Sequence, residues 1–170
     1  VFAAATCDGT IQVYDTRAPD RPMLSPKIHD CDVNVMSWNR LVSNLLATGS
    51  DDGTLSVWDL RTFGKADKAT PLARFTAHKT PITSVEWHPT DESMLGVTDD
   101  VGAYVYDLSV EEDAMAPASK NVAVADIPPQ LLFCHAGSRL FKELHWHPQI
   151  SSCMMTTALT GFSVFIPSNL

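Results

Sequence analysis

The chain has 170 residues, of which 45% are hydrophobic and 19% charged, and its formal net charge is -8 at pH 7. This composition is ordinary for a globular protein that buries a core. The chain lacks the roughly 18 consecutive apolar residues of a membrane span and the basic flank of a signal peptide, and its acidity disfavours nucleic acid. We therefore expect neither a membrane nor a nucleic acid as partner.

A sequence unit recurs along the chain, in which an Asp-Gly-type turn leads into a short strand that ends in an aromatic residue. It occurs three times and is half present once more, at Asp8-Gly9 to Tyr14, Asp52-Gly53 to Trp58, Asp100-Val101-Gly102 to Tyr106 and Thr160-Gly161 to Phe165. Self-similarity at a period of roughly 40 to 50 residues is typical of repeat architectures. The repeat therefore sets the expected fold.

Each full copy opens with a histidine. His29, His78 and His135 precede their aromatic residues by 29, 28 and 30 positions, whereas the link from an aromatic strand to the next histidine grows from 14 to 28 positions. Units of constant length joined by links of variable length fit stacked supersecondary units whose loops diversify.

Within the second copy the pattern predicts four short strands. They are bounded by turn residues and cover Val33–Trp38, Leu45–Gly49, Thr54–Asp59 and Pro71–Thr76. Apolar residues alternate only loosely in them, as in strands covered on both faces where one sheet packs against the next. Because the chain shows no long helical periodicity, we expect an all-β fold.

Four polar and aromatic residues of the second copy form a further pattern: His29, Thr48, Asp52 and Trp58. They resemble the hydrogen-bonded tetrad of a blade in a WD-repeat propeller, in which Asp accepts from the His ring, the ring contacts the hydroxyl, and the hydroxyl contacts the indole N–H. In other copies Gly96 and Ala4 stand in place of the Thr, and Leu159 replaces the turn Asp. We expect those blades to depend more on packing.

The resemblance implies a WD-repeat β-propeller, of which this chain holds about three and a half four-stranded blades from a seven-bladed ring. Propellers typically have four to eight blades, so we expect a carboxyl-terminal fragment of a longer protein. The expected divisions, all within one propeller domain, are a partial blade, two blades, and an acidic loop with the last blade, at residues 1–20, 21–60, 61–109 and 110–170.

Longer runs narrow the resemblance. Val85-Glu86-Trp87-His88-Pro89 and Leu144-His145-Trp146-His147-Pro148 are similar to histone-chaperone propellers related to the retinoblastoma-associated proteins, and residues 126–133, 142–148 and 157–162 resemble the carboxyl end of the glutamate-rich WD-repeat family. These relatives imply a non-enzymatic scaffold of the nucleus and nucleolus without cofactor. It would chaperone basic proteins in large ribosomal subunit biogenesis, with a ribosomal protein, histones and pre-ribosomal particles as partners.

The link after the third copy, residues 100–130, is the most acidic part of the chain and is called the acidic link below. It holds six carboxylates against Lys120 alone. Such a surface attracts basic proteins, and loops on a rigid scaffold gather binding residues. The alternative is a solvated loop without a partner. By resemblance to the histone chaperones, whose acidic loop with paired prolines grips a histone helix, we expect partner contacts from Glu111, Glu112, Asp113, Asp126, Ile127 and Leu131.

The sequence gives little evidence for a metal site or a catalytic site. The cysteines lack metal-ligand spacing, and we expect small buried side chains at Cys7, Cys31, Cys134 and Cys153. His145 and His147 share one face of a strand, but no Cys or carboxylate cluster accompanies them, which favours a strand-to-turn role over a metal site. His29, Thr48 and Asp52 are the residue types of a hydrolase triad, yet the indole of Trp58 and the repetition of the pattern favour structure.

An alternative function comes from two turns, Asp15-Thr16-Arg17 and Asp59-Leu60-Arg61, that close consecutive strands. They are similar to the WD-x-Arg signature of propellers that serve as substrate receptors of a cullin-type ubiquitin ligase. Arg17 and Arg61 would then bind carboxylates of the ligase adaptor bidentately. Two other interpretations stay open: each Arg caps its own turn, or the propeller is a generic assembly platform.

Overall fold

The computed structural model describes residues 1–63, 69–111 and 127–169. In these ranges the chain forms 13 strands, which assemble into four antiparallel sheets. None of the described residues is helical, so no helix in these ranges has the length and apolar character needed to cross a membrane.

Each sheet is built from strands that follow one another in the chain. The first sheet pairs β1 (Phe2–Ala5) with β2 (Ile11–Tyr14). The second contains β3 (Val33–Trp38), β4 (Leu45–Ser50), β5 (Leu55–Asp59) and β6 (Ala73–Phe75). The third contains β7 (Ile82–Trp87), β8 (Met94–Asp99), β9 (Gly102–Asp107) and β10 (Leu131–Ala136). The fourth contains β11 (Glu143–Trp146), β12 (Met154–Ala158) and β13 (Gly161–Phe165).

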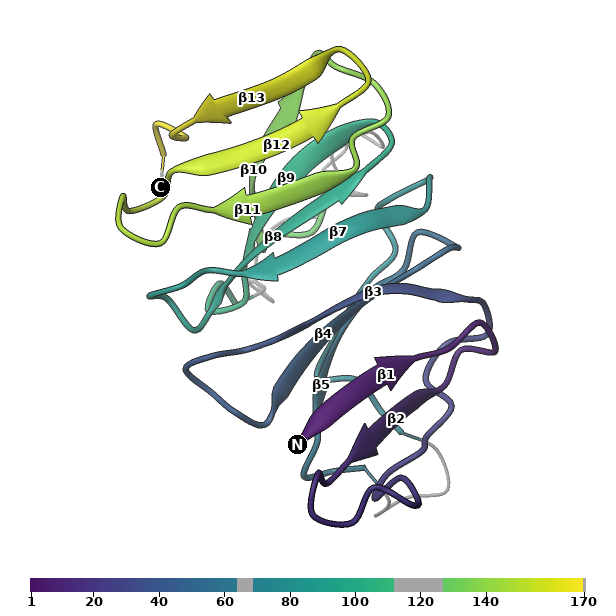
Figure 1. Cartoon of the computed structure of the whole chain (residues 1–170). Helices are drawn as coiled ribbons and strands as arrows, with labels where there is room; N and C mark the ends of the chain where they lie inside the picture. Colours follow the sequence, from purple (N-terminus) through teal and green to yellow (C-terminus); the bar gives the residue numbers. More distant parts are fainter. Residues whose placement is uncertain (64–68, 112–126, 170) are drawn as a thin grey trace.

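This architecture confirms the predicted all-β fold of consecutive blades. The sheets succeed one another in a row, with the N-terminus in the first and the C-terminus beside the last (Figure 1). The expected divisions after residues 60 and 109 fall inside sheets, between β5 and β6 and between β9 and β10. The repeat in the sequence is therefore offset by one strand from the sheet, because the fourth strand of the second and third sheets, β6 or β10, comes after the expected division.

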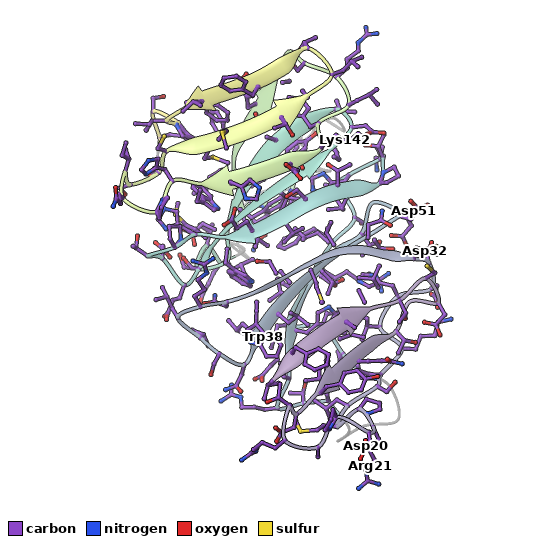
Figure 2. The ribbon with its side chains drawn as sticks, in the orientation of Figure 1. Asp20, Arg21, Asp32, Trp38, Asp51 and Lys142 are labelled. Atoms are coloured by element: carbon purple, nitrogen blue, oxygen red, sulfur yellow. The ribbon has the colours of Figure 1, made fainter. Side chains whose placement is uncertain are left out.

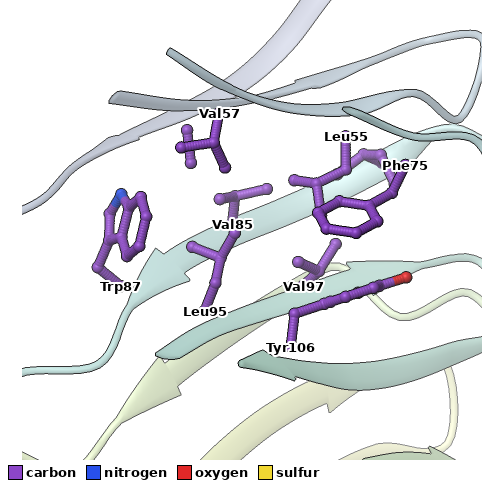
Figure 3. Packing of buried hydrophobic residues seen from close by; sticks show 10 residues of the cluster. Leu55, Val57, Phe75, Val85, Trp87, Leu95, Val97 and Tyr106 are labelled. Atoms are coloured by element: carbon purple, nitrogen blue, oxygen red, sulfur yellow. The ribbon is translucent and has the colours of Figure 1, made fainter. Parts of the chain in front are cut away.

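The hydrophobic core lies between the sheets. Leu55 and Val57 of β5 face Val85, Leu95 and Tyr106 of the third sheet in one buried cluster (Figure 3). Two further clusters fill the space between the first and second sheets and between the third and fourth. Because burial of one Leu or Val side chain contributes about 1.5–3 kcal/mol, the stacking of sheets is the main source of stability. It also explains why the strands are apolar on both faces.

Two of the Asp-Gly turns fasten one repeat to the next. Gly9 and Gly53 have φ angles of 81° and 80°, a conformation that favours glycine. The backbone N–H groups of Ile28 and His29 donate to the Gly9 carbonyl at 2.9 and 3.1 Å. At Gly53 a side chain would lie 2.6 Å from the carbonyl oxygen of His78. Each turn is thus held against the histidine segment that opens the following copy.

A second set of contacts between turns lies along one side of the molecule. The N–H of Asp51 donates to the carbonyl of Asp32 at 3.0 Å, and Lys142 pairs with Asp100 at 3.5 Å across the third and fourth sheets. Asp32, Asp51 and Lys142 lie along the same side in Figure 2. These contacts fix the turn ends of the strands, which lie opposite the ends where the chain leaves β5 and β9 toward the links.

Candidate functional site

The part of the acidic link that follows β9 is held at both of its ends by hydrogen bonds. The N–H of Asp107 donates to the Gln130 carbonyl at 2.8 Å, and Gln130 Nε2 donates to the carbonyl of Val110 at 2.9 Å. The carboxylate of Asp107 also accepts from the N–H and hydroxyl of Ser109, at 2.8 and 2.7 Å. The scaffold therefore presents the link from a narrow, ordered base, as expected for a binding loop.

The predicted contact residues of this link differ in their surroundings. Glu111 is exposed, and the Ile127 side chain is 53% exposed. Leu131 instead lies in β10 opposite Tyr106 and packs, half buried, against the core between the second and third sheets. Ile127 is thus the apolar side chain that the base of the link presents to solvent, whereas Leu131 mainly stabilises the sheet. The other three predicted contacts, Glu112, Asp113 and Asp126, lie outside the described residues.

Arg17 and Arg61 fold back onto the aspartate two positions earlier. Arg17 Nε lies 3.0 Å from both carboxylate oxygens of Asp15, and its Nη2 donates to Oδ2 at 2.5 Å. Arg61 repeats this geometry with Asp59, at 3.0, 3.0 and 2.6 Å. The hydrogen bonds from the Arg17 side chain and backbone lower the pKa of Asp15 to about 2. Each Arg therefore caps its own turn.

The residues of the expected tetrad meet only in part. His29 Nε2 lies 2.8 Å from Thr48 Oγ1, and the indole N–H of Trp58 donates to the same oxygen at 2.9 Å. Asp52 Oδ1 instead accepts from the N–H of Thr54 at 2.8 Å, and His29 Nδ1 has no hydrogen-bond partner in the described structure. The expected bond from the His29 ring to Asp52 is therefore not formed, because this carboxylate closes its own turn.

Burial governs the electrostatics of this group. Burial lowers the pKa of His29 below its usual 6.5, and the nearby carboxylate of Asp52 opposes the effect only in part. Burial tends to raise the pKa of Asp52, but its hydrogen bonds from Thr54 outweigh burial and the pKa is lowered. The ring is accordingly neutral and the carboxylate ionised near pH 7.

The third sheet contains a complete hydrogen-bonded chain that the sequence analysis missed. The hydroxyl of Tyr106 donates to His78 Nε2 at 2.9 Å, and His78 Nδ1–H donates to Asp99 Oδ2 at 2.9 Å. All three side chains are buried. We expected this blade to depend more on packing because Gly96 stands in place of the Thr, but the structure keeps a full polar chain, since the phenol reaches the ring directly and needs no Thr. We call these three residues the tyrosine relay.

Asp99 is the ionised end of the tyrosine relay. Burial opposes its charge most strongly, yet the hydrogen bonds from His78 and from the N–H groups of Val101 and Gly102 outweigh burial and lower its pKa. At the other end, burial raises the pKa of Tyr106, which stays protonated and able to donate. A buried carboxylate that accepts three hydrogen bonds stabilises the turn between β8 and β9.

Tryptophans join the first strands of neighbouring sheets. The indole N–H of Trp87 in β7 donates to the Ser37 carbonyl in β3 at 3.0 Å, and that of Trp146 in β11 donates to the Glu86 carbonyl in β7 at 3.1 Å. Trp38 differs, because its N–H donates to Ser43 within its own sheet. The Trp-His-Pro phrases therefore position one sheet on the next, a role that the local sequence did not reveal.

The other histidines of these phrases have structural partners. His147 Nδ1 accepts from the N–H groups of Gln149 and Ile150 at 3.1 and 2.9 Å, and His88 Nδ1 accepts from Thr90 at 3.3 Å. His145 lies 3.0 Å from Glu86 across two sheets. His147 thus occupies the predicted strand-to-turn position, and within the described ranges no three His, Cys, Asp or Glu side chains gather as metal ligands would.

The cysteines differ from the expectation of buried side chains. Cys153 is buried, whereas Cys7, Cys31 and Cys134 are exposed, and all four are free thiols. Cys7 and Cys31 lie in turns rather than in strands. Cys134 lies in β10, an edge strand of its sheet.

The remaining copies rely on aromatic packing. Phe2 stacks on Tyr14 in the first sheet at a ring distance of 5.0 Å, and His135 stacks on Phe165 at 4.3 Å. Aromatic pairs at such distances contribute about 0.5–1.5 kcal/mol beyond the area that they bury. Packing thus takes the place of the tetrad in these two copies.

Sequence comparisons identify relatives of the chain. The WD domain, G-beta repeat family matches residues 21–59 and 69–100. Ribosome assembly protein rrb1 of Schizosaccharomyces pombe is 45% identical over 97% of this chain and 35% of its own length. Protein HEAT STRESS TOLERANT DWD 1 of Arabidopsis thaliana is 46% identical over 84% of this chain and 41% of its own length. Glutamate-rich WD repeat-containing protein 1 of Dictyostelium discoideum is 42% identical over 36% of this chain and 13% of its own length.

More distant similarity extends to histone-binding proteins and to solved structures. Histone-binding protein MSI1 of Saccharomyces cerevisiae is 28% identical over 75% of this chain and 30% of its own length. A chain in the crystal structure of the mitotic checkpoint complex superposes with a TM-score of 0.75 at 19% identity, over 98% of this chain and 45% of that one, which shows the shared fold. The chain spans less than half the length of these relatives. The chain is a WD40 repeat protein related to the ribosome assembly protein rrb1 and to the glutamate-rich WD repeat-containing proteins, with histone-binding WD proteins as more distant relatives.

Proposed function

We propose that this protein is a non-enzymatic scaffold that chaperones basic nuclear proteins during assembly of the large ribosomal subunit and also binds histones. The observation that carries the proposal is the 45% identity with ribosome assembly protein rrb1 over 97% of the chain. WD40 scaffolds are typically non-enzymatic, which agrees with this role. The more distant similarity to histone-binding protein MSI1 supports the histone partner, and both relatives suit a nuclear and nucleolar setting.

On this proposal, the acidic side chains bind the client through electrostatic attraction. The chain carries a net charge of -8, and the acidic link contributes six carboxylates against one lysine. These groups would neutralise Lys and Arg side chains that otherwise bind RNA indiscriminately, and rRNA phosphates would compete for the same side chains at release. Because the Debye length shortens from about 10 Å at 0.1 M salt to about 3 Å at 1 M, binding should weaken as salt is raised.

The base of the link suits a partner that is both basic and apolar. Exposed Glu111 lies on the segment that leaves the sheet after β9, and Ile127 lies on the segment that returns to β10. The hydrogen bonds of Gln130 hold these two segments together. A basic amphipathic segment would present its Lys and Arg side chains to the carboxylates and an apolar side chain to Ile127.

A pull-down from nuclear extract with the full-length protein tests the proposal. One variant neutralises the link, and a matched variant neutralises four exposed carboxylates elsewhere. The substitutions are Glu111→Gln, Glu112→Gln, Asp113→Asn and Asp126→Asn, against Asp20→Asn, Asp30→Asn, Glu92→Gln and Glu143→Gln. We expect mass spectrometry to show loss of a ribosomal protein or histones in the link variant alone, more strongly at raised salt. An unchanged partner list in the link variant would contradict the proposal.

A ubiquitin-ligase receptor is the second candidate, favoured by the exposure of two equivalent arginines. The side chains of Arg17 and Arg61 are 87% and 66% exposed although each binds its own aspartate. That pairing uses Nε and Nη2, and a guanidinium has five N–H donors, so a further carboxylate can approach from solvent. In the double variant Arg17→Ala and Arg61→Ala, adaptor binding should vanish while basic partners persist. If neither association changes, the arginines are turn caps and nothing more.

A further inference from the structure

A groove of about 510 Å³ lies between β6 and the base of the acidic link. Leu72 and Phe75 line it from the β6 side, and Leu108, Val110 and Pro128 line it from the link side. Its volume lies within the range of about 300–1,000 Å³ that is usual for ligand sites. It is a different surface from the Asp-x-Arg turns and from the tetrad.

The groove is preformed. The link side is fixed by the bond from Asp107 N–H to the Gln130 carbonyl and by the bond from Gln130 Nε2 to Val110. The N–H of Leu131 also donates to the Pro128 carbonyl at 3.0 Å. A site whose walls are already ordered loses less conformational entropy when a ligand binds. A short peptide segment can therefore be held there without folding of the walls.

One side of the groove belongs to a sheet edge. The strand β6 is the last in its sheet and pairs with β5 through Ala73, Arg74 and Phe75. In the described sheets it has a neighbour on one side only. Such an edge leaves backbone N–H and C=O groups for an extended peptide, which is a common mode of peptide recognition. The occupant that suits this geometry is an extended segment.

The lining selects the side chains of that segment. Leu72 is 60% exposed and lies beside Leu108 and Val110, so the groove presents apolar surface to solvent. The charged lining residues lie on opposite sides, with Arg74 on β6 and Glu111 on the link. A basic segment is therefore oriented, since its Lys and Arg side chains are repelled from the Arg74 side and attracted to the Glu111 side.

We propose that this groove anchors one large apolar side chain of an extended basic segment in the client protein, with an adjacent Lys or Arg paired with Glu111. The inference rests on the proposed function, because it assigns an anchoring site for the same class of client. The acidic link attracts the segment through its charge, and the groove selects segments that carry an apolar residue at one position.

Two fluorescein-labelled peptides test this with the full-length protein. One is a Lys- and Arg-rich dodecamer with a single central Leu, and the other has Ser in place of that Leu. By fluorescence anisotropy, wild type should bind the Leu peptide about tenfold more tightly, the effect expected for burial of part of one Leu side chain. Leu72→Ser should bring the ratio of the two dissociation constants close to one, and Glu111→Lys should weaken the binding of both peptides. The control Leu159→Ser, an exposed leucine next to the fourth sheet, should leave the ratio unchanged.

The outcomes separate this inference from the proposed function. Equal affinity of wild type for the two peptides, or a ratio that Leu72→Ser leaves unchanged, would overturn the groove as an anchor. If both peptides still bind and weaken with salt in that case, the electrostatic chaperone function stands. If neither peptide binds wild type, both the anchor and the chaperone function are contradicted. Because Leu72 is largely exposed, its replacement should not disturb folding.

Discussion

Replacing Tyr106 by Phe removes one hydroxyl from the tyrosine relay and keeps the rest of the ring. The hydroxyl donates to His78 Nε2 at 2.9 Å, and the residues Tyr106 and His78 are 0% and 5% exposed, so solvent cannot replace the lost donor. An unpaired buried polar group costs about 1–3 kcal/mol. Ring packing against Phe75, at 4.8 Å, is retained. We therefore expect the free energy of unfolding to fall by about 1–3 kcal/mol, a substantial part of the 5–15 kcal/mol typical of a domain.

Urea unfolding of the full-length protein measures this effect as a lower midpoint at an unchanged slope. Tyr14→Phe is the matched control, since its hydroxyl donates to Gln12 Oε1 at 2.8 Å from a half-buried position. Loss of a bond that water can replace should change stability by no more than about 0.5 kcal/mol. If the two substitutions have the same effect, burial of the relay does not decide its contribution, and the reasoning above is wrong.

Three further predictions concern the same framework. Thr48→Val keeps the side-chain shape but leaves two buried partners, Trp58 Nε1–H and His29 Nε2, unpaired, so urea unfolding should show a loss of about 2–5 kcal/mol. Trp146→Phe removes the bond to the Glu86 carbonyl and should cost about 1–3 kcal/mol, with faster amide hydrogen exchange in β11. Because burial lowers the pKa of His29 below 6.5, the unfolded chain binds this proton first. Stability should therefore be complete above pH 6.5 and decrease as pH falls below it, whereas a urea midpoint that stays constant from pH 7.5 to 5.5 would contradict this.

The strands and their turns could be predicted from local sequence. The Asp-Gly pairs at Gly9 and Gly53 predict turns, and both glycines have the positive φ that such turns require. Trp58 and Tyr106 mark strand ends at a fixed distance from those turns. These features depend on neighbours in sequence, and for that reason a repeat pattern is enough to find them.

The tyrosine relay could not be predicted by counting along the repeat. Counting back from the aromatic residue places Gly96 in the position of Thr48. The last pair of the β4–β5 hairpin is Gly49 with Leu55, which leaves five residues in the turn. The last pair of the β8–β9 hairpin is Thr98 with Ala103, which leaves four, so the second turn is one residue shorter. A shift of one residue moves a side chain to the opposite face of a strand. The shorter turn between β8 and β9 therefore places Asp99 on the same face as Tyr106 and directs Gly96 toward Leu144 of the fourth sheet.

Contacts between sheets were equally beyond local inference. The Trp-His-Pro motifs suggested a family but not a role, because the indole N–H of Trp87 donates to the carbonyl of Ser37, which lies 50 residues earlier in the chain. Arg17 and Arg61 show the opposite case. Each could reach its own aspartate or a partner. The side-chain geometry shows the internal pair, and the exposed guanidinium groups leave the partner contact to the binding test proposed above.

The framework and the proposed binding surfaces depend on each other. The bond from Trp87 in β7 to Ser37 in β3 and the packing of Tyr106 on Phe75 fix the third sheet against the second, and this in turn fixes the base of the acidic link relative to β6. On the proposed function, charge then governs how fast a basic client arrives, because long-range attraction raises association rates. Apolar contact in the groove governs how long the client stays, because differences between related complexes lie mainly in dissociation. When rRNA displaces the client, it competes for the Lys and Arg side chains and so removes the electrostatic part of the binding free energy. A single apolar side chain in the groove is too small an anchor to hold the client after that loss.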